Sequence, residues 1–149
     1  LSPRQDQTLS VRVKIDTNPP AGATTSTTVI RRFVTLHLLH YDRSSLLAGK
    51  LHAVLSRPYT KGQDLYDLVW YLADRTWPEP NFTFLNNALA QTGWPGPRLT
   101  PENWRRLVTK RMEKIKWDQA VKDVSPFLER PQDVALLTLE NVRNLLLTG

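Results

Sequence analysis

The sequence predicts an α+β fold, in which short strands at the N-terminus precede a mostly helical region of five or six helices. Segments before residue 41 have the composition and spacing of strands, whereas the apolar residues after it recur at helical spacing. We therefore expect residues 1–40 to hold a small sheet and residues 41–149 to form a helical region. Two strands alone are marginally stable, so we expect the sheet to be incomplete.

Two segments carry the strand predictions. Residues 10–16 (SVRVKID) alternate apolar and polar side chains, which indicates a strand with one buried face. Residues 17–28 (TNPPAGATTSTT) contain two prolines and a glycine and are typical of turns. Residues 28–40 (TVIRRFVTLHLLH) are rich in β-branched side chains and predict a second strand.

The first three predicted helices follow one another with short breaks. Residues 42–57 place leucine and valine on one helical face, with Asp42 or Ser44 as the N-cap. Residues 63–76 predict a second helix, because their apolar side chains also recur on one face. Residues 81–93 predict a third helix that ends at a glycine.

The remaining helices include the clearest helix start in the chain. Residues 100–115 begin with Thr100 as the expected N-cap and Pro101 at the first helical position. The last two predictions are a helix that begins near Asp118 and is interrupted at Pro126, and a helix over residues 138–147.

Composition limits the chemistry that this chain can perform. Among its 149 residues, 20 Lys and Arg outnumber 14 Asp and Glu, which gives a formal net charge of +6. Such an excess suits a polyanionic partner, such as nucleic acid or a nucleotide. The absence of cysteine excludes disulfides, thiolate zinc sites and cysteine nucleophiles. The longest unbroken apolar run, residues 68–73, is too short to cross a membrane.

One segment, residues 48–68 (AGKLHAVLSRPYTKGQDLYDL), concentrates charged groups on two predicted helices. The short connection between these helices predicts an αα-hairpin, which would bring Lys50 near Asp64 and Asp67 across a common solvent-accessible hollow. The two aspartates are three residues apart and therefore share one helix face. The alternative is structural, because acids in a first helical turn are usually caps and a lysine on a helix is usually solvated.

The helix predicted over residues 100–115 carries a basic stripe. Arg106, Lys110 and Lys114 recur at four-residue spacing, and Trp117 lies on the same side, where it could stack on a base. Such a stripe would neutralise several phosphates of a nucleic acid. The alternative is a solvated amphipathic helix.

The charged segment resembles a motif of a known family. The pattern A-x-K-L-H-A-L…R…K-x-R-D-L-Y-D-L is typical of AbiEii-type nucleotidyltransferase toxins, the toxin half of type IV abortive-infection toxin–antitoxin systems. The likeness is specific across residues 48–68 and extends more weakly from about residue 10 to the C-terminus. It implies that residues 1–40 hold part of a nucleotidyltransferase-like sheet.

The resemblance implies roles for particular residues. Lys50, Asp64 and Asp67 match catalytic positions of the family, and Lys50, Arg57 and Lys61 are implied to bind the nucleotide. Asp16 is implied as a metal ligand, the third carboxylate that such folds often place on the sheet. The alternative for Asp16 is the outward face of an amphipathic strand.

The sequence departs from the family pattern in two places. Gln63 stands where the family usually has arginine, which removes a bidentate phosphate donor. The Gly-Ser…Asp-x-Asp element, which supplies the family's metal-binding carboxylate pair, has no counterpart in residues 1–40. The chain begins with Leu1 and its single methionine is Met112, so we expect it to be the C-terminal part of a longer protein and inactive by itself.

The function that the resemblance implies is the transfer of a nucleotide from an NTP to an RNA such as tRNA, with Mg²⁺ as cofactor. It also implies a cytoplasmic protein whose partners are the NTP, the RNA and a cognate antitoxin. The alternative from the residues alone is a non-catalytic basic helical module that binds nucleic acid or a partner protein.

Overall fold

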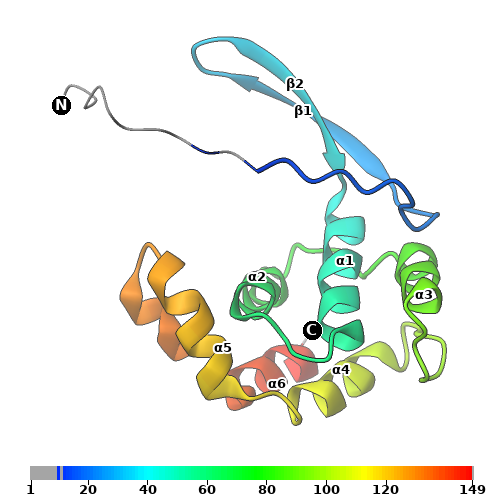
Figure 1. Ribbon diagram of the computed structural model, residues 1–149, viewed down its shortest axis with the longest axis vertical. Coiled ribbons are helices and arrows are strands. Elements are labelled where there is room, and N and C mark those ends of the chain that lie inside the picture. The colour runs from blue at the N-terminus through cyan, green and yellow to red at the C-terminus, as the bar shows by residue number, and fades with distance from the viewer. Residues whose placement is uncertain (1–9, 11, 149) are drawn as a thin grey trace.

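The computed structural model describes residue 10 and residues 12–148, which form a two-stranded antiparallel sheet followed by a helical body (Figure 1). The predicted α+β class is therefore confirmed. The elements, in chain order, are β1 (Thr25–Arg31), β2 (Thr35–Tyr41), α1 (Arg43–Ser56), α2 (Gly62–Ala73), α3 (Phe82–Gln91), α4 (Trp104–Met112), α5 (Trp117–Val124), the 3₁₀ helices η1 (Ser125–Phe127) and η2 (Pro131–Leu136), and α6 (Leu139–Thr148). No helix in this described part of the chain is long and apolar enough to span a membrane.

The strands form a hairpin that projects from the helical body, and β2 leads directly into α1 (Figure 1). The register pairs Thr25 with Tyr41 and Arg31 with Thr35. The predicted single strand over residues 28–40 is therefore wrong, because this range includes parts of both strands and the turn between them. That turn, Arg32–Val34, lacks the glycine, proline or asparagine that normally signals a turn, so the composition concealed it.

The strand predicted over residues 10–16 is also wrong. Apart from Val11, which lies outside the described residues, this segment is assigned to no strand, and Val13 and Ile15 are 78% and 83% exposed. Its alternating pattern is present in the sequence, but a strand also requires a neighbour with which to exchange backbone hydrogen bonds. The pattern alone could not supply that neighbour.

A polar junction fixes the base of the hairpin to the helices. Asp42, one of the two predicted N-caps, accepts a hydrogen bond from the backbone N–H of Ser45 at 2.8 Å, which confirms it as the cap of α1. Thr24 donates its hydroxyl to Asp42 and its backbone N–H to the buried Ser45 hydroxyl. Asn81 donates to the Gly22 carbonyl at 2.8 Å. The hydrogen bonds from Thr24 and Ser45 hold the pKa of Asp42 below its ordinary value.

The hydrophobic core lies between the helices, with α1 at its centre. Helix α1 packs against α2, α3 and α4, while α2 also packs against α5 and α6. The leucines and valine predicted to face the core from α1 are buried, as are the large side chains of its neighbours. The largest fully buried side chains include Leu51, Val54, Leu65, Leu68, Leu85, Leu89, Trp104, Val108, Met112 and Leu146. Burial on this scale fixes the relative positions of α1 and α2, which carry the charged segment.

Several helix ends differ from the predictions. The prediction of Thr100 as an N-cap is wrong: α4 begins at Trp104 after a turn, and the Thr100 N–H donates to the Asn103 side chain at 2.9 Å. Helix α4 ends at Met112, so Lys114 lies in the turn that follows it. Helix α3 ends as predicted, with Gly93 just beyond it at a positive φ of 71°.

Candidate functional site

The connection between α1 and α2 is built to fold the two helices back on each other. Arg57 ends α1 in extended backbone, as expected of a residue that precedes proline. Helix α2 then begins at Gly62, whose Cα faces α5 so closely that an added Cβ would lie 2.0 Å from the Ala120 carbonyl oxygen. The predicted αα-hairpin is therefore present, and it places the first turn of α2 opposite α1.

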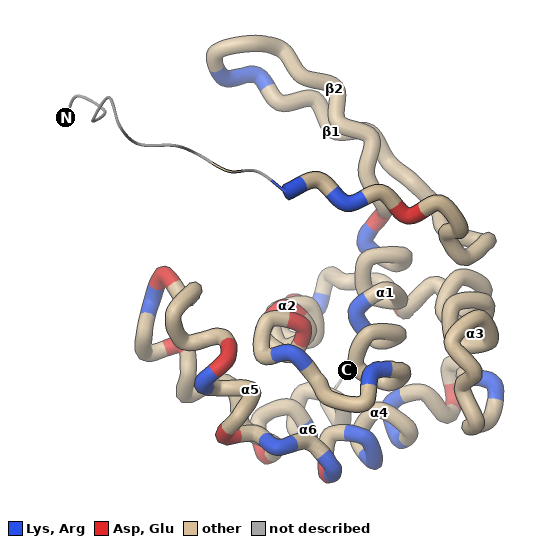
Figure 2. The backbone as a smooth tube through the Cα atoms, in the orientation of Figure 1, with Lys and Arg blue, Asp and Glu red and all other residues tan. Residues whose placement is uncertain are grey.

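Four charged side chains converge across this hairpin. The Lys50 Nζ atom lies 3.2 Å from Asp64 Oδ1 and 2.6 Å from Asp67 Oδ2. Arg57 forms an ion pair with the other oxygen of Asp64. Figure 2 shows the acidic positions of α2 beside basic positions of α1 and its following connection. The expected convergence of Lys50 with both aspartates is confirmed, and these four residues are the charged cluster.

The charged cluster is electrically balanced and partly buried. Two cations face two carboxylates, and Asp64 is the most enclosed, with 11% of its side chain exposed. Burial alone would lower the pKa of Lys50, but the hydrogen bonds and charges of Asp67 and Asp64 outweigh it and raise the pKa above its ordinary value. Lys50 is therefore charged at neutral pH, and the repulsion between the aspartates is compensated.

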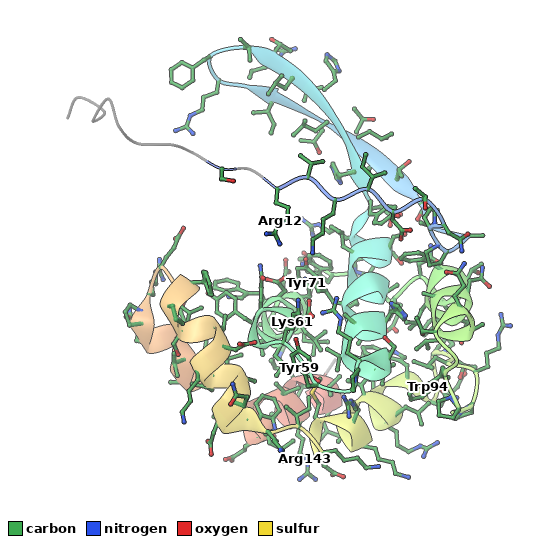
Figure 3. The ribbon with its side chains drawn as sticks, viewed as in Figure 1. Arg12, Tyr59, Lys61, Tyr71, Trp94 and Arg143 are labelled. Atoms are coloured by element: carbon green, nitrogen blue, oxygen red, sulfur yellow. The ribbon has the colours of Figure 1, made fainter. Side chains whose placement is uncertain are left out.

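The chemistry available to the charged cluster follows from its groups. Ammonium and guanidinium groups donate to phosphate oxygens, and a carboxylate can accept the proton of an attacking hydroxyl. Lys61 lies exposed at the N-cap position of α2, close along the chain to Arg57 (Figure 3). The same contacts also form an ion-pair network that joins α1 and its following connection to α2.

Asp16 occupies a different environment. It is exposed, lies in the unpaired segment that precedes the hairpin, and accepts a hydrogen bond from the backbone N–H of Asn18 at 3.0 Å. Within the described part of the chain, no group of three or more acidic or histidine side chains is placed to hold a metal ion. Both carboxylates of the charged cluster already share the Lys50 ammonium, so the described residues do not by themselves fit a magnesium site.

A hollow of 470 Å³ is lined by none of the four residues of the charged cluster. It is bordered by the end of α2, the connection to α3 and the start of α4, and its lining includes Tyr71, Trp77 and Arg105. Tyr71 stacks on Trp77 with ring centroids 3.9 Å apart. Since none of Lys50, Asp64 and Asp67 lines this hollow, the common hollow expected beside them stays a prediction.

Two of the three residues of the basic stripe line the same hollow. Lys110 and Lys114 line a hollow of 460 Å³ together with Trp94, whereas Arg106 is exposed on α4 outside that lining. Trp117 packs against the core and donates its indole N–H to the Met112 carbonyl at 3.2 Å. Sequence reasoning missed Trp94, although the Trp-Pro-Gly-Pro run that contains it is an unusual way to join two helices.

His52 offers a pH-dependent readout of this part of the fold. Partial burial and then the charge of Arg57 lower the pKa of His52, although a backbone hydrogen bond at Ala88 opposes the shift. Its stabilising contribution is therefore complete above the unfolded pKa of about 6.5 and is lost as the pH falls toward the lower folded pKa. We expect the melting temperature of the wild type to fall more between pH 7.5 and pH 5.5 than that of His52→Gln. Parallel melting curves for the two proteins would contradict this prediction.

The class of protein follows from the match between the chain and a known family, with which the charged groups are consistent. A small sheet joined to paired helices that present a lysine, an arginine and two aspartates supplies groups used in nucleotidyl transfer. The chain matches, over residues 2–141, the family model described as "Nucleotidyl transferase AbiEii toxin, Type IV TA system". It therefore belongs to the AbiEii nucleotidyltransferase toxin family, and the resemblance seen in the sequence is confirmed. No curated protein and no solved structure matches the chain significantly.

Proposed function

We propose that this chain serves a nucleotidyltransferase toxin that moves a nucleotide from an NTP to an RNA, with tRNA as the expected acceptor, in the cytoplasm. The observation that carries the proposal is the position of the Lys50 ammonium, 3.2 Å and 2.6 Å from two carboxylates on the neighbouring helix. The AbiEii family membership of the chain supports the reaction class and a cognate antitoxin as partner. The identity of the acceptor rests on the resemblance.

The four residues of the charged cluster and the neighbouring Lys61 have separate roles in the proposed transfer. Lys50, Arg57 and Lys61 contact the NTP phosphates and neutralise the charge that develops on them. A hydroxyl oxygen of the RNA attacks the α-phosphorus, pyrophosphate leaves, and Asp64 accepts the proton of the attacking hydroxyl. Asp67 positions Lys50 through its 2.6 Å contact. Every one of these groups lies on α1, on α2 or on the connection between them.

Metal chemistry lies outside this assignment. NTP and metal use are typical of nucleotidyltransferases, and a bound Mg²⁺ would supply positive charge to the phosphates. The described residues do not form a site for it, so no step is assigned to a metal ion here. Asp16 as a metal ligand remains a prediction from the resemblance.

A label-transfer assay tests the proposed function. The full-length protein that contains this chain is incubated with each α-labelled NTP, Mg²⁺ and tRNA, in parallel with the 149-residue chain alone. We expect label on the tRNA with the full-length protein and none with the chain alone, because the chain contains no Asp-x-Asp pair. Failure of the full-length protein with every NTP would contradict the proposed function, and transfer by the chain alone would contradict the need for that pair.

A second candidate function is a non-catalytic module that binds nucleic acid or a partner protein. The basic hollow lined by Trp94, Lys110 and Lys114 favours it, because its lining is cationic and includes no residue of the charged cluster. If binding is the whole function, toxicity in cells depends on Arg106, Lys110 and Lys114 and is indifferent to Lys50. The reverse dependence on Lys50 supports the enzyme.

A further inference from the structure

Two adjoining hollows lie along the side of α4 that faces the ends of α1 and α3. The first has a volume of 460 Å³ and is lined by residues that include Trp94, Lys110, Arg111 and Lys114. The second has a volume of 210 Å³, and its lining includes Tyr59 together with Arg111 and Lys114. Because they share these two cations, we treat them as one feature, the Trp94 groove. Figure 2 shows Lys and Arg positions following one another along α4 and the turn after it.

The electrostatics of the Trp94 groove select a polyanion. Lys110, Arg111 and Lys114 line the first hollow, and Lys116 adds a further cation to the second. Over the described residues, neither lining includes an Asp or Glu. The groove thus differs from the charged cluster, where each cation has a carboxylate partner, because its lysines are available to neutralise phosphates.

Trp94 is partly buried against the core and is held in position before any ligand arrives. Its indole N–H donates to the Pro97 carbonyl at 3.1 Å, and its ring lies directly against Gly96. A Cβ at Gly96 would fall 2.4 Å from the indole, so only glycine leaves the ring in this place. A fixed aromatic surface loses little conformational freedom on binding and is therefore an efficient stacking platform.

The second hollow is lined by the ring of Tyr59 and by Thr60, whose hydroxyl has no hydrogen-bond partner. Tyr59 is 64% exposed in the connection between α1 and α2, while Trp94 lies beyond the end of α3 (Figure 3). Thr60, which also lines this hollow, carries a buried hydroxyl without a hydrogen-bond partner, the one such buried side-chain atom in the part that the structure describes. A ligand oxygen that reaches this hydroxyl would satisfy it.

Arg57 links the Trp94 groove to the charged cluster. Arg111 donates to the Val54 carbonyl at 3.0 Å and to the Arg57 carbonyl at 2.7 Å, so α4 is anchored to the end of α1. The side chain of the same Arg57 pairs with Asp64. A polyanion bound in the Trp94 groove would therefore lie next to the charged cluster, to whose residues the transfer step is assigned.

We propose that the Trp94 groove binds single-stranded RNA, with bases stacked on Trp94 and Tyr59 and phosphates beside Lys110, Lys114 and Lys116. A single strand is favoured over a duplex because only unstacked bases can lie against aromatic rings set in hollows. The choice of RNA as the polyanion rests on the proposed function. The groove, its aromatic rings and its cations are features of the structure and do not depend on the proposed function.

Fluorescence anisotropy of a 5′-labelled 12-nucleotide RNA, without NTP or Mg²⁺, tests this proposal on the 149-residue chain. We expect Trp94→Ala and Tyr59→Ala each to weaken binding by about 5- to 100-fold, since each removes one stacking partner. Gly96→Ala should weaken binding as well, because its Cβ displaces the indole, while Trp94→Phe should retain most of the affinity. If a Trp94 variant fails to fold, Tyr59→Ala still tests the proposal, because Tyr59 is exposed.

Matched controls separate stacking from a general effect of charge. Trp70→Ala removes a half-exposed tryptophan on α2 that lines neither hollow, and should change affinity less than twofold. The pair Lys110→Gln and Lys114→Gln should reduce the slope of log affinity against log salt by about 1.4, or about 0.7 per phosphate contact. Lys122→Gln, on the exposed side of α5, should leave that slope unchanged.

The outcomes distinguish this inference from the proposed function. Equal loss in Trp94→Ala and Trp70→Ala, or tighter binding of a duplex than of the single strand, would overturn the groove as a single-strand site. If RNA binds but the full-length protein never transfers label, the proposed function is contradicted and RNA binding by the groove is supported. If transfer occurs but the single strand does not bind, RNA binding by the groove is contradicted and the proposed function is supported.

Discussion

Lys50→Ala in the full-length protein is expected to slow nucleotide transfer by about 100- to 1,000-fold, the usual loss when one preorganised charge-stabilising donor is removed. The Lys50 ammonium lies 2.6 Å from Asp67 and 3.2 Å from Asp64 in the charged cluster. Without it, the two carboxylates keep only the Arg57 pair with Asp64, and an incoming triphosphate meets net negative charge. The measurement is the initial rate of label transfer at saturating NTP.

A structural role for Lys50 would also reduce activity, so the loss must be separated from instability. Breaking a largely buried ion pair by removing one partner should lower the free energy of unfolding, by about 1–3 kcal/mol at this degree of exposure. The double variant Lys50→Met with Asp67→Asn removes one charge of each sign and should recover part of that stability. If Lys50 contacts phosphate, the double variant stays inactive despite its recovered stability.

Two results would contradict the catalytic assignment. One is wild-type transfer by a folded Lys50→Ala protein, and the other is restored transfer in the double variant. Lys122→Ala is the matched control, because it removes an exposed lysine from α5 and should change neither rate nor stability. The single variant Asp64→Asn should lose transfer activity, as Lys50→Ala does, since both residues belong to the charged cluster.

Gly62→Ala should destabilise the fold by about 3 kcal/mol, which corresponds to a fall in melting temperature of roughly 6–12 °C for a domain of this size. The new Cβ would lie 2.0 Å from the Ala120 carbonyl oxygen and 3.0 Å from the Val124 Cβ. Because the first contact is with backbone, α2 and α5 must separate to accommodate the methyl group. Urea and thermal unfolding measure the effect.

Gly49→Ala provides the opposite expectation on the neighbouring helix. Its Cβ would meet only the Phe84 ring edge, at an ordinary 4.0 Å, and the position lies inside α1. Alanine should therefore stabilise the helix by about 0.5–1 kcal/mol. If both variants stabilised the protein, the close approach of α2 to α5 would be refuted.

Local chemistry made much of the helical part predictable from the sequence. The Asp42 cap, the apolar face of α1 and the glycine beyond α3 depend on residues close together in the chain, and all three are present. The meeting of Lys50 with Asp64 and Asp67 was predictable for the same reason. A short connection between two amphipathic helices leaves them few ways to pack other than as a hairpin.

The N-terminal part was predicted less well, because strands are stabilised by partners that local sequence does not specify. Residues 10–16 have the alternation of a strand and are nevertheless assigned to none, while the turn at Arg32–Val34 carries no turn-forming residue. The presence or absence of a hydrogen-bonded partner strand decided both outcomes: Thr25–Arg31 pairs with Thr35–Tyr41, whereas the described residues of 10–16 pair with no strand.

The sequence by itself thus determined the helical segments, the charged motif and the family, since capping, periodicity and motif spacing are properties of neighbouring residues. Only the tertiary structure decided which surfaces form. Trp94, Tyr59 and Arg111 come from three separate segments, and they border one groove because the buried faces of α1, α3 and α4 pack around a common core. Core packing sums many weak contacts between distant residues, so its result is fixed by the whole chain and by no single segment of it.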